Sequence, residues 1–277
     1  MAIEAGLGHQ HADFQVSHRF DLTTGGVESH SYRAEAGGAA VLGSIQPQVI
    51  PNQPDGTLDL AAVEAAIKPD DPHFAKTRLL ALENTISGRA IPRAYLEEAV
   101  ALARRRGLST HLDGARIFNA AIHLRIKVRE LCRGFDSVSS CLSKGLGAPA
   151  GTVLLGNREF IGKARRARKI LGGAMRQAGV LAAAGLYALE HNVGRLAEDH
   201  ENAERLARGL RELDLPVEQN TNMVFVRLPQ DRVAALTTHL KQNQILASAA
   251  PRMRLVTHLD VDAAGIDRAL GAFRGFF

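Results

Sequence analysis

At its most informative point the chain reads Ser139-Ser140-Cys141-Leu142-Ser143-Lys144-Gly145-Leu146-Gly147-Ala148-Pro149. Lys144 follows a run of β-type residues and is surrounded by small ones. A lysine amine that is partly stripped of water can form a Schiff base, and neighbouring glycines let a flat molecule approach the backbone. The alternative interpretation is a surface lysine in a glycine-rich turn, which the spacing alone favours.

An acidic residue, Asp113, precedes Lys144 by 31 positions, in the segment Thr110-His111-Leu112-Asp113-Gly114-Ala115-Arg116. It lies at the C-terminal end of a predicted strand, the edge at which open α/β sheets bind ligands. A carboxylate there can keep a pyridine nitrogen protonated, whereas the alternative role is a helix N-cap. Paired with a Schiff-base lysine, it is typical of enzymes that use pyridoxal phosphate (PLP). Together the two segments outweigh their separate alternatives.

The rest of the chain alternates short apolar runs with amphipathic stretches, the pattern of a parallel sheet covered by helices. The sequence predicts strands over residues 48–50, 78–82, 110–112, 137–140 and 152–155, and helices over 58–67, 92–106 and 177–190. Residues 26–190 therefore form a large α/β domain with a mostly parallel sheet. A second pattern, with strands over 223–228 and 253–256 and helices over 193–213, 232–242 and 262–276, predicts a smaller α+β domain over residues 191–277.

Residues 1–25 show no sustained periodicity and are expected to be disordered or spurious. Hydrophobic residues make up 45% of the chain, and its two cysteines are too few for a disulfide framework, so a reducing, cytoplasmic compartment is expected. Neither a signal peptide nor a membrane-spanning stretch is predicted. The net charge of +5 suits anionic substrates, and the basic run over 163–169 lacks interleaved aromatic residues. Neither nucleic acid, a membrane nor a metal ion is therefore expected as a partner.

The two segments resemble the low-specificity threonine aldolases of the β-eliminating lyase group, in which H-x-D-G-A-R is followed by S-K-G-L-G-x-P. The resemblance extends to four further stretches, Glu35-Ala36-Gly37-Gly38, Leu82-Glu83-Asn84-Thr85, Gly172-Gly173-Ala174-Met175-Arg176-Gln177 and Arg254-Leu255-Val256-Thr257-His258-Leu259-Asp260. It runs from about Gly26 to the C-terminus. It implies the PLP-dependent transferase-like fold, known as fold type I.

By this resemblance, three residues handle the cofactor. Lys144 holds PLP as the internal aldimine, Asp113 pairs with the ring nitrogen, and His30 stacks on the ring. His30 is also the candidate base for the β-hydroxyl proton, because imidazole titrates near neutral pH.

The resemblance also implies a set of cationic residues around the substrate. Arg116 and Arg254 match arginines that bind the substrate carboxylate, and Arg116 also lies beside the cofactor; a bidentate guanidinium suits that planar anion. Lys169 and Arg176 match positions that line the site, often from a neighbouring subunit. A homo-oligomer, either a dimer or a tetramer, is therefore expected.

The implied reaction is the reversible cleavage of a β-hydroxy-α-amino acid, L-threonine or L-allo-threonine, to glycine and acetaldehyde. PLP absorbs the electron pair of the broken Cα–Cβ bond. Racemisation, transamination and β-elimination are alternatives, because the same fold hosts them. The match around His30 favours aldol cleavage.

The sequence departs from the family pattern in two places. Ile86 stands where many members carry a histidine that contacts the substrate hydroxyl, and isoleucine cannot exchange a proton. The family's first segment, with S-D-T and a Gly-Thr loop that grips the PLP phosphate at a helix N-terminus, has no counterpart before Gly26. The alternative to an active aldolase is therefore an inactive remnant, with residues 1–25 produced by a frameshift or a misplaced start codon.

Overall fold

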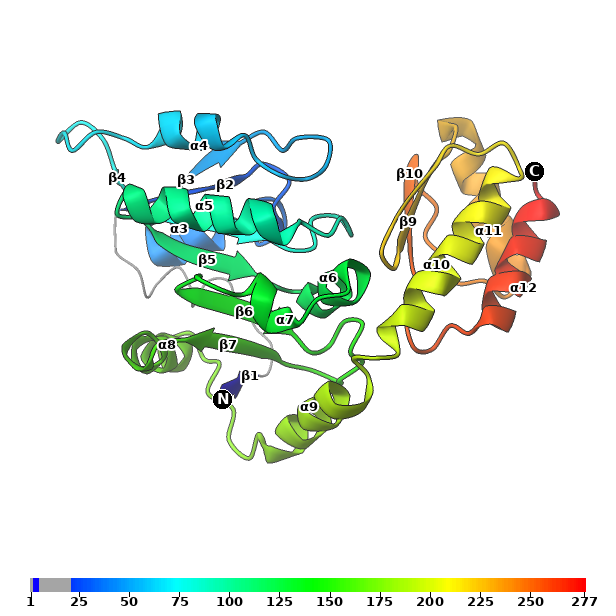
Figure 1. The fold of residues 1–277 in the computed structure, drawn as a ribbon. Helices are drawn as coiled ribbons and strands as arrows, with labels where there is room; N and C mark the ends of the chain where they lie inside the picture. The colour runs from blue at the N-terminus through cyan, green and yellow to red at the C-terminus, as the bar shows by residue number, and fades with distance from the viewer. Residues whose placement is uncertain (1, 5–20) are drawn as a thin grey trace. The chain divides into compact units, whose positions relative to one another are not determined.

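The computed structural model describes residues 2–4 and 21–277, which fall into two compact units, Met1–Asn192 and Val193–Phe277 (Figure 1). Each unit has a hydrophobic core of its own, as separate domains do. The division lies close to the boundary expected after residue 190. In the part of the chain that is described, no helix combines the length and the apolar character needed to cross a bilayer.

The sheet of the first unit has seven strands among the described residues, in the order β1-β7-β6-β5-β4-β2-β3. Their bounds are β1 Ala2–Glu4, β2 Asp21–Gly26, β3 Gln46–Ile50, β4 Lys76–Glu83, β5 Ser109–Asp113, β6 Ser137–Cys141 and β7 Thr152–Gly156. Strands β2 to β6 run parallel, β7 runs antiparallel to β6, and β1 runs antiparallel to β7. The carboxyl ends of β4, β5 and β6 therefore meet at one edge of the sheet.

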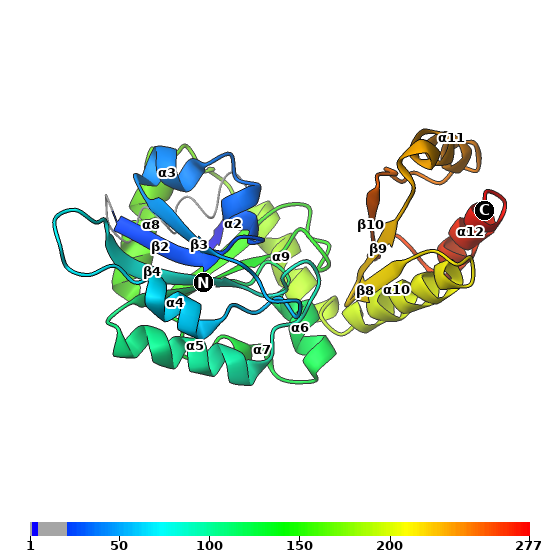
Figure 2. The same ribbon diagram turned by 90° about the horizontal axis from the view of Figure 1, so that it is seen from above.

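The helices of this unit are α2 His30–Arg33, α3 Gly38–Gly43, α4 Leu60–Ala66, α5 Arg93–Arg105, α6 Ile117–Leu124, α7 Val128–Leu131, α8 Arg158–Ile170 and α9 Gly179–His191. Residues of α4, α5, α6 and α7 form the main core with the apolar face of the sheet. Figure 2 shows α3 and α8 on the opposite side of the sheet from α4 and α5. The sheet is thus covered from both sides, as the sequence predicted.

Helix α5 shows how the sequence specifies such an element. Leu96, Ala99, Val100 and Ala103 recur at helical spacing and are all buried. Burying each leucine or valine side chain stabilises the fold by about 1.5–3 kcal/mol. Two arginines in the last turn interact favourably with the helix dipole. The predicted helix over residues 92–106 is confirmed.

The two faces of the sheet differ because side chains alternate along each strand. Leu80 and Leu82 of β4, with Leu112 of β5, point into the main core. Glu83 and Asp113, each one residue further along, line a small cavity on the other face. Alternation therefore gathers polar side chains of neighbouring strands at the carboxyl edge of a single face.

Strand β2 corrects the expectation that residues 1–25 lack structure. It pairs in parallel with β3 on one side and β4 on the other. The sequence of this stretch does not alternate between apolar and polar residues, so the pattern does not predict a strand. Its threonines are β-branched, however, and such residues favour strands. Gly25 fits closely against the Ala81 carbonyl, which an added Cβ would approach to 3.1 Å. Within residues 1–25, the expectation for residues 1 and 5–20 lies outside the described residues.

The second unit contains α10 Leu196–Arg211, β8 Val217–Asn220, β9 Met223–Arg227, η1 Gln230–Arg232, α11 Val233–Gln242, β10 Arg252–Val256 and α12 Ala263–Arg274. Its three strands form an antiparallel sheet in the order β10-β9-β8. The predicted smaller α+β domain is confirmed. Strand β8 escaped prediction because its residues, Val-Glu-Gln-Asn, are mostly polar and only half-buried.

Candidate active site

Three predicted site residues and a fourth residue, Glu83, come together at the carboxyl edge of the first unit's sheet. Glu83 ends β4, Asp113 ends β5, and Lys144 lies in the loop that follows β6. His30 begins α2, a few residues after the end of β2. The proximity is electrostatic as well as topological, because Lys144, His30 and Glu83 each interact with Asp113. The structure thus unites the lysine, acid and histidine that the sequence predicted.

Asp113 is a buried carboxyl group, exposed over only 6% of its surface. Burial raises its pKa, while the positive charge of Lys144 and a hydrogen bond from the Ala115 backbone N–H, at 3.0 Å, oppose that rise. A buried carboxylate needs a cation to offset its lost hydration. Asp113 is therefore suited to hold a protonated ring nitrogen.

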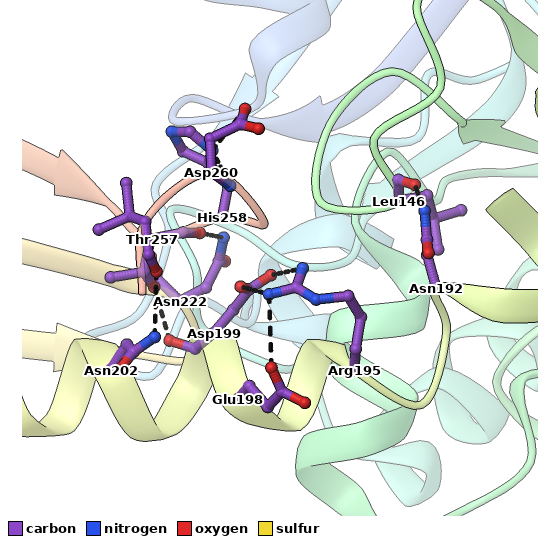
Figure 3. Close-up of polar contacts among 11 residues, drawn as sticks. Leu146, Asn192, Arg195, Glu198, Asp199, Asn202, Asn222, Thr257, His258 and Asp260 are labelled. Atoms are coloured by element: carbon purple, nitrogen blue, oxygen red, sulfur yellow. Dashed lines mark hydrogen bonds and ion pairs between the residues drawn. The ribbon is translucent and has the colours of Figure 1, made fainter. Parts of the chain in front are cut away.

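The loop that carries Lys144 is anchored on both sides of the lysine. Before it, the Leu142 N–H donates to the Gly151 carbonyl oxygen at 2.9 Å. After it, the Gly147 N–H donates to the Lys144 carbonyl oxygen at 2.9 Å, in a turn where Gly147 has a φ of +73°. The Asn192 side chain donates to the Leu146 carbonyl oxygen at 2.8 Å (Figure 3). Lys144 is therefore half-buried, and it projects from a turn whose backbone is hydrogen-bonded on both sides.

His30 is held by two acidic residues. Its Nδ1 lies 2.8 Å from Oε1 of Glu35, and its backbone N–H donates to Oε2 of Glu83 at 2.7 Å. The Glu35 contact favours the tautomer with the proton on Nδ1, which makes Nε2 the basic nitrogen of the ring. About half of the His30 side chain is exposed, so the imidazole can meet a ligand.

Glu83 is a site residue that sequence reasoning missed. Burial raises its pKa to about 8, and the nearby Asp113 carboxylate adds to the rise. Hydrogen bonding from His30 and the charges of Lys144 and Arg116 oppose it. The alternation along β4 could have revealed Glu83, because it places this residue beside Asp113 on the same face.

A neutral histidine, His111, lies next to these carboxyl groups. It is buried, which lowers its pKa to about 4, and its Nδ1 lies 2.8 Å from Oγ of Ser137. His111 lines the same small cavity as Glu83 and Asp113. Because this imidazole is uncharged, the positive charge that acts on Glu83 and Asp113 comes from other groups, among them Lys144, Arg116 and His30.

The four cationic residues predicted to line the site lie in different parts of the fold. Half-buried Arg116 precedes α6, and its charge reaches Glu83. Lys169 lies in the last turn of α8 and Arg176 follows that helix; both are exposed. Arg254 belongs to β10 of the second unit, where it lines a cavity of about 570 Å³. Of the three that belong to the described part of the first unit, Arg116 is the one whose charge acts on the pair of carboxyl groups formed by Glu83 and Asp113.

Ile86, the departure from the family pattern, is a core residue. It is 2% exposed and packs in the main core of the first unit. Its Cγ2 lies so close to Gly56 that a Cβ added there would approach it to 2.2 Å. Ile86 therefore packs in the core, at the position where the family pattern has a histidine.

The residues present fit the aldehyde and the ring of the PLP that the sequence predicted. A half-buried lysine lies beside a buried carboxyl group whose burial disfavours its own charge. A partly exposed imidazole lies on the same edge. Such a donor set suits an aldehyde cofactor with a cationic ring nitrogen and a flat face.

Comparisons with known proteins agree with this site. The family model described as beta-eliminating lyase matches residues 12–230. The chain is 52% identical over 252 residues to the low specificity L-threonine aldolase of Escherichia coli (strain K12), covering 91% of this chain and 76% of that protein. It is 40% identical over 266 residues to the probable low-specificity L-threonine aldolase 2 of Arabidopsis thaliana, covering 91% of this chain and 75% of that protein.

Solved structures show the same fold. The threonine aldolase of Leishmania major superposes with a TM-score of 0.85 at 21% identity, covering 99% of this chain and 84% of that one. The serine palmitoyltransferase of Sphingomonas wittichii superposes with a TM-score of 0.76 at 20% identity, covering 99% and 71%. The predicted fold type I architecture is confirmed, and so is PLP as the cofactor of the group. On sequence identity and coverage, the chain belongs to the β-eliminating lyase family and, within it, to the low-specificity L-threonine aldolases.

Proposed function

We propose that this chain cleaves L-threonine and L-allo-threonine to glycine and acetaldehyde, with PLP held by Lys144 and Asp113. The observation that carries the proposal is the meeting of Lys144, Asp113 and His30 at one edge of the sheet. The names of its relatives, which are threonine aldolases, support the choice of substrate. When bound, PLP supplies an electron sink for the pair released as the Cα–Cβ bond breaks.

Asp113 and Lys144 divide the work of holding the cofactor. Asp113 would hold a proton on the ring nitrogen, since its buried carboxylate would be stabilised by a neighbouring positive charge. The Lys144 amine would attach the cofactor covalently, and its anchored loop keeps that amine within reach of Asp113. Asp113 ends one strand and Lys144 follows the end of the next, so both side chains need little rearrangement when the cofactor binds.

His30 is the proposed base. Its Nε2 takes the proton of the substrate β-hydroxyl group, and Glu35 at Nδ1 stabilises the positive charge that the imidazole then carries. Ile86 cannot share this task, because it is apolar and buried. A base so oriented contributes about 10²–10⁴-fold to the rate.

Four cationic residues are proposed to bind the substrate carboxylate and line the site. Arg116 and Arg254 offer guanidinium groups that match a planar carboxylate. Lys169 and Arg176 are exposed, which fits a role in the site of a second copy of the chain. Arg116 also supplies positive charge near Glu83, which lies beside the cofactor-binding residue Asp113.

The proposal of a homo-oligomer is supported by the exposed side chains near Lys169 and Arg176. The end of α8, the following turn and α9 expose a series of large apolar side chains, Ile170, Met175, Val180, Leu186 and Tyr187. An excess of large exposed apolar side chains is typical of protein interfaces. We propose that a second copy of the chain covers these side chains. Lys169 and Arg176 of one copy would then reach the active site of the other.

The double substitution Val180→Glu and Tyr187→Glu is expected to dissociate the oligomer, because it places two charges in an apolar interface. Light scattering after size exclusion would measure the mass. Val41→Glu is the matched control, since Val41 on α3 is 77% exposed and Val180 is 71% exposed. An unchanged mass in the double variant would contradict this interface.

The two cysteines, Cys132 and Cys141, are both free thiols. This supports the proposal that the chain works in a reducing, cytoplasmic compartment.

The substrate proposal is tested by identifying the products. Purified protein with added PLP is expected to convert L-threonine and L-allo-threonine to equal amounts of glycine and acetaldehyde. L-2-Aminobutyrate, which lacks the β-hydroxyl group, is the control and should not be cleaved. Appearance of a keto acid as the main product, or of D-allo-threonine from L-threonine, would show a different PLP reaction instead.

A further inference from the structure

Glu83 makes a contact that the catalytic roles above leave unexplained. It ends β4, directly beside Asp113 in the parallel register. Its Oε2 accepts the backbone N–H of His30 at 2.7 Å, across 53 residues of sequence. Glu83 therefore joins the strand that borders Asp113 to the first turn of α2.

Helix α2 needs such a contact because it is only four residues long. The first N–H groups of any helix lack an intrahelical partner, and Ser29 at the N-cap makes no side-chain hydrogen bond to supply one. The preceding residues are held elsewhere: the Val27 N–H donates to the Ile50 carbonyl oxygen at 2.9 Å, and the Glu28 N–H donates to Asn52 Oδ1 at 2.9 Å. Glu83 adds the contact to β4.

The groups around Glu83 determine its charge state. Burial and the Asp113 carboxylate raise its pKa to about 8, against the opposing effects of the His30 N–H, Lys144 and Arg116. Near neutral pH the carboxyl is thus mainly protonated. A protonated carboxyl keeps a carbonyl oxygen that accepts an N–H, so the contact survives in either protonation state.

We propose that Glu83 is a positioning residue, whose carboxyl group ties the first turn of α2 to the carboxyl end of β4 and thereby fixes the His30 imidazole beside Asp113 and Lys144. The catalytic consequence rests on the proposed function of His30. The tether itself does not, because it depends only on the hydrogen bond between the two elements.

Two substitutions separate the tether from the charge. Glu83→Gln keeps an acceptor oxygen of the same reach, whereas Glu83→Leu removes the acceptor. Glu83→Ala, studied in parallel, guards against a packing effect peculiar to leucine. Glu35→Gln is the matched control, since it changes the partner of the His30 ring and leaves the backbone contact in place.

Hydrogen exchange of the His30 amide in the PLP-loaded full chain measures the tether directly. The Leu and Ala variants are expected to exchange at least about tenfold faster at residues 27–34, because their amide has lost its acceptor. Wild type, Glu83→Gln and Glu35→Gln should exchange alike. Unchanged exchange in both the Leu and Ala variants would overturn the proposal, whatever activity the protein shows.

The kinetic readout distinguishes positioning from general stabilisation. The Leu variant is expected to lose about 10²-fold in kcat, since a small misplacement of a catalytic group has an effect of that size. Its KM and the visible absorption of bound PLP should stay close to wild type, and Gln should restore kcat to within about threefold. Equal kcat values for the Leu and Gln variants, in a protein that cleaves threonine, would also overturn the proposal.

Discussion

Lys144→Ala is expected to abolish threonine cleavage, lowering kcat/KM by on the order of 10⁴-fold or more, the scale seen when a covalent catalytic group is removed. The visible absorption of bound PLP should disappear with it. The physical reason is that alanine has no amine, while the loop that presents position 144 is held by backbone hydrogen bonds of its neighbours and should keep its shape. The variant should therefore fold and still lack the covalent attachment.

Lys163→Ala is the control for this substitution. Lys163 lies on exposed α8 and forms an ion pair with Glu159 at 2.7 Å, an i,i+4 pair of the kind that contributes only a few tenths of a kcal/mol. It should retain the visible absorption and the cleavage rate of the wild type. Persistence of both signals in Lys144→Ala would show that the covalent lysine lies elsewhere.

Asp113→Asn is expected to lower kcat/KM by about 10²–10⁴-fold, because removing one partner of a buried charge pair costs about 3–5 kcal/mol. Asparagine has nearly the same size, and its side-chain oxygen can still accept the Ala115 N–H. It cannot, however, hold the proton on the ring nitrogen of the cofactor. Since Lys144 is intact, the visible absorption of bound PLP should remain, which distinguishes this variant from Lys144→Ala.

The stability of the same variant provides an internal control. Burial raises the pKa of Asp113, so without the cofactor its ionised form destabilises the folded state at neutral pH. Asp113→Asn removes that ionisation, and the cofactor-free variant should melt no lower than the wild type. A slow variant with a lower melting temperature would indicate lost folding, and a kcat/KM within about threefold of wild type would contradict the role of Asp113.

The sequence predicted the parts of the site that depend on local pattern. Asp113 and Lys144 each follow a short β-type run, and parallel strands bring such ends to one edge. Their meeting could therefore be expected from the sequence alone. The main strands and α5 were predictable for the same reason, since their apolar spacing is regular.

Other parts could not be predicted, because they depend on tertiary contacts. Four of the six residues of strand β2 are threonine or glycine, and the strand is stabilised by its two neighbours in the sheet. Glu83 belongs to a stretch that resembles the family, but its contact with His30 joins residues 53 positions apart. Lys169 and Arg176 are exposed, and the role proposed for them depends on contacts with a second copy, which the sequence of one chain does not specify.

The most direct measurement is the chemical trapping of the cofactor on the wild-type protein. Reduction with sodium borohydride converts the bond between a lysine and PLP into a stable amine, and peptide mass mapping then locates it. A pyridoxyl group on the peptide that contains Lys144, and on no other lysine at comparable yield, is the predicted result. A folded protein in which Lys144 remains unmodified, or in which a different lysine carries the group, would contradict the site described above.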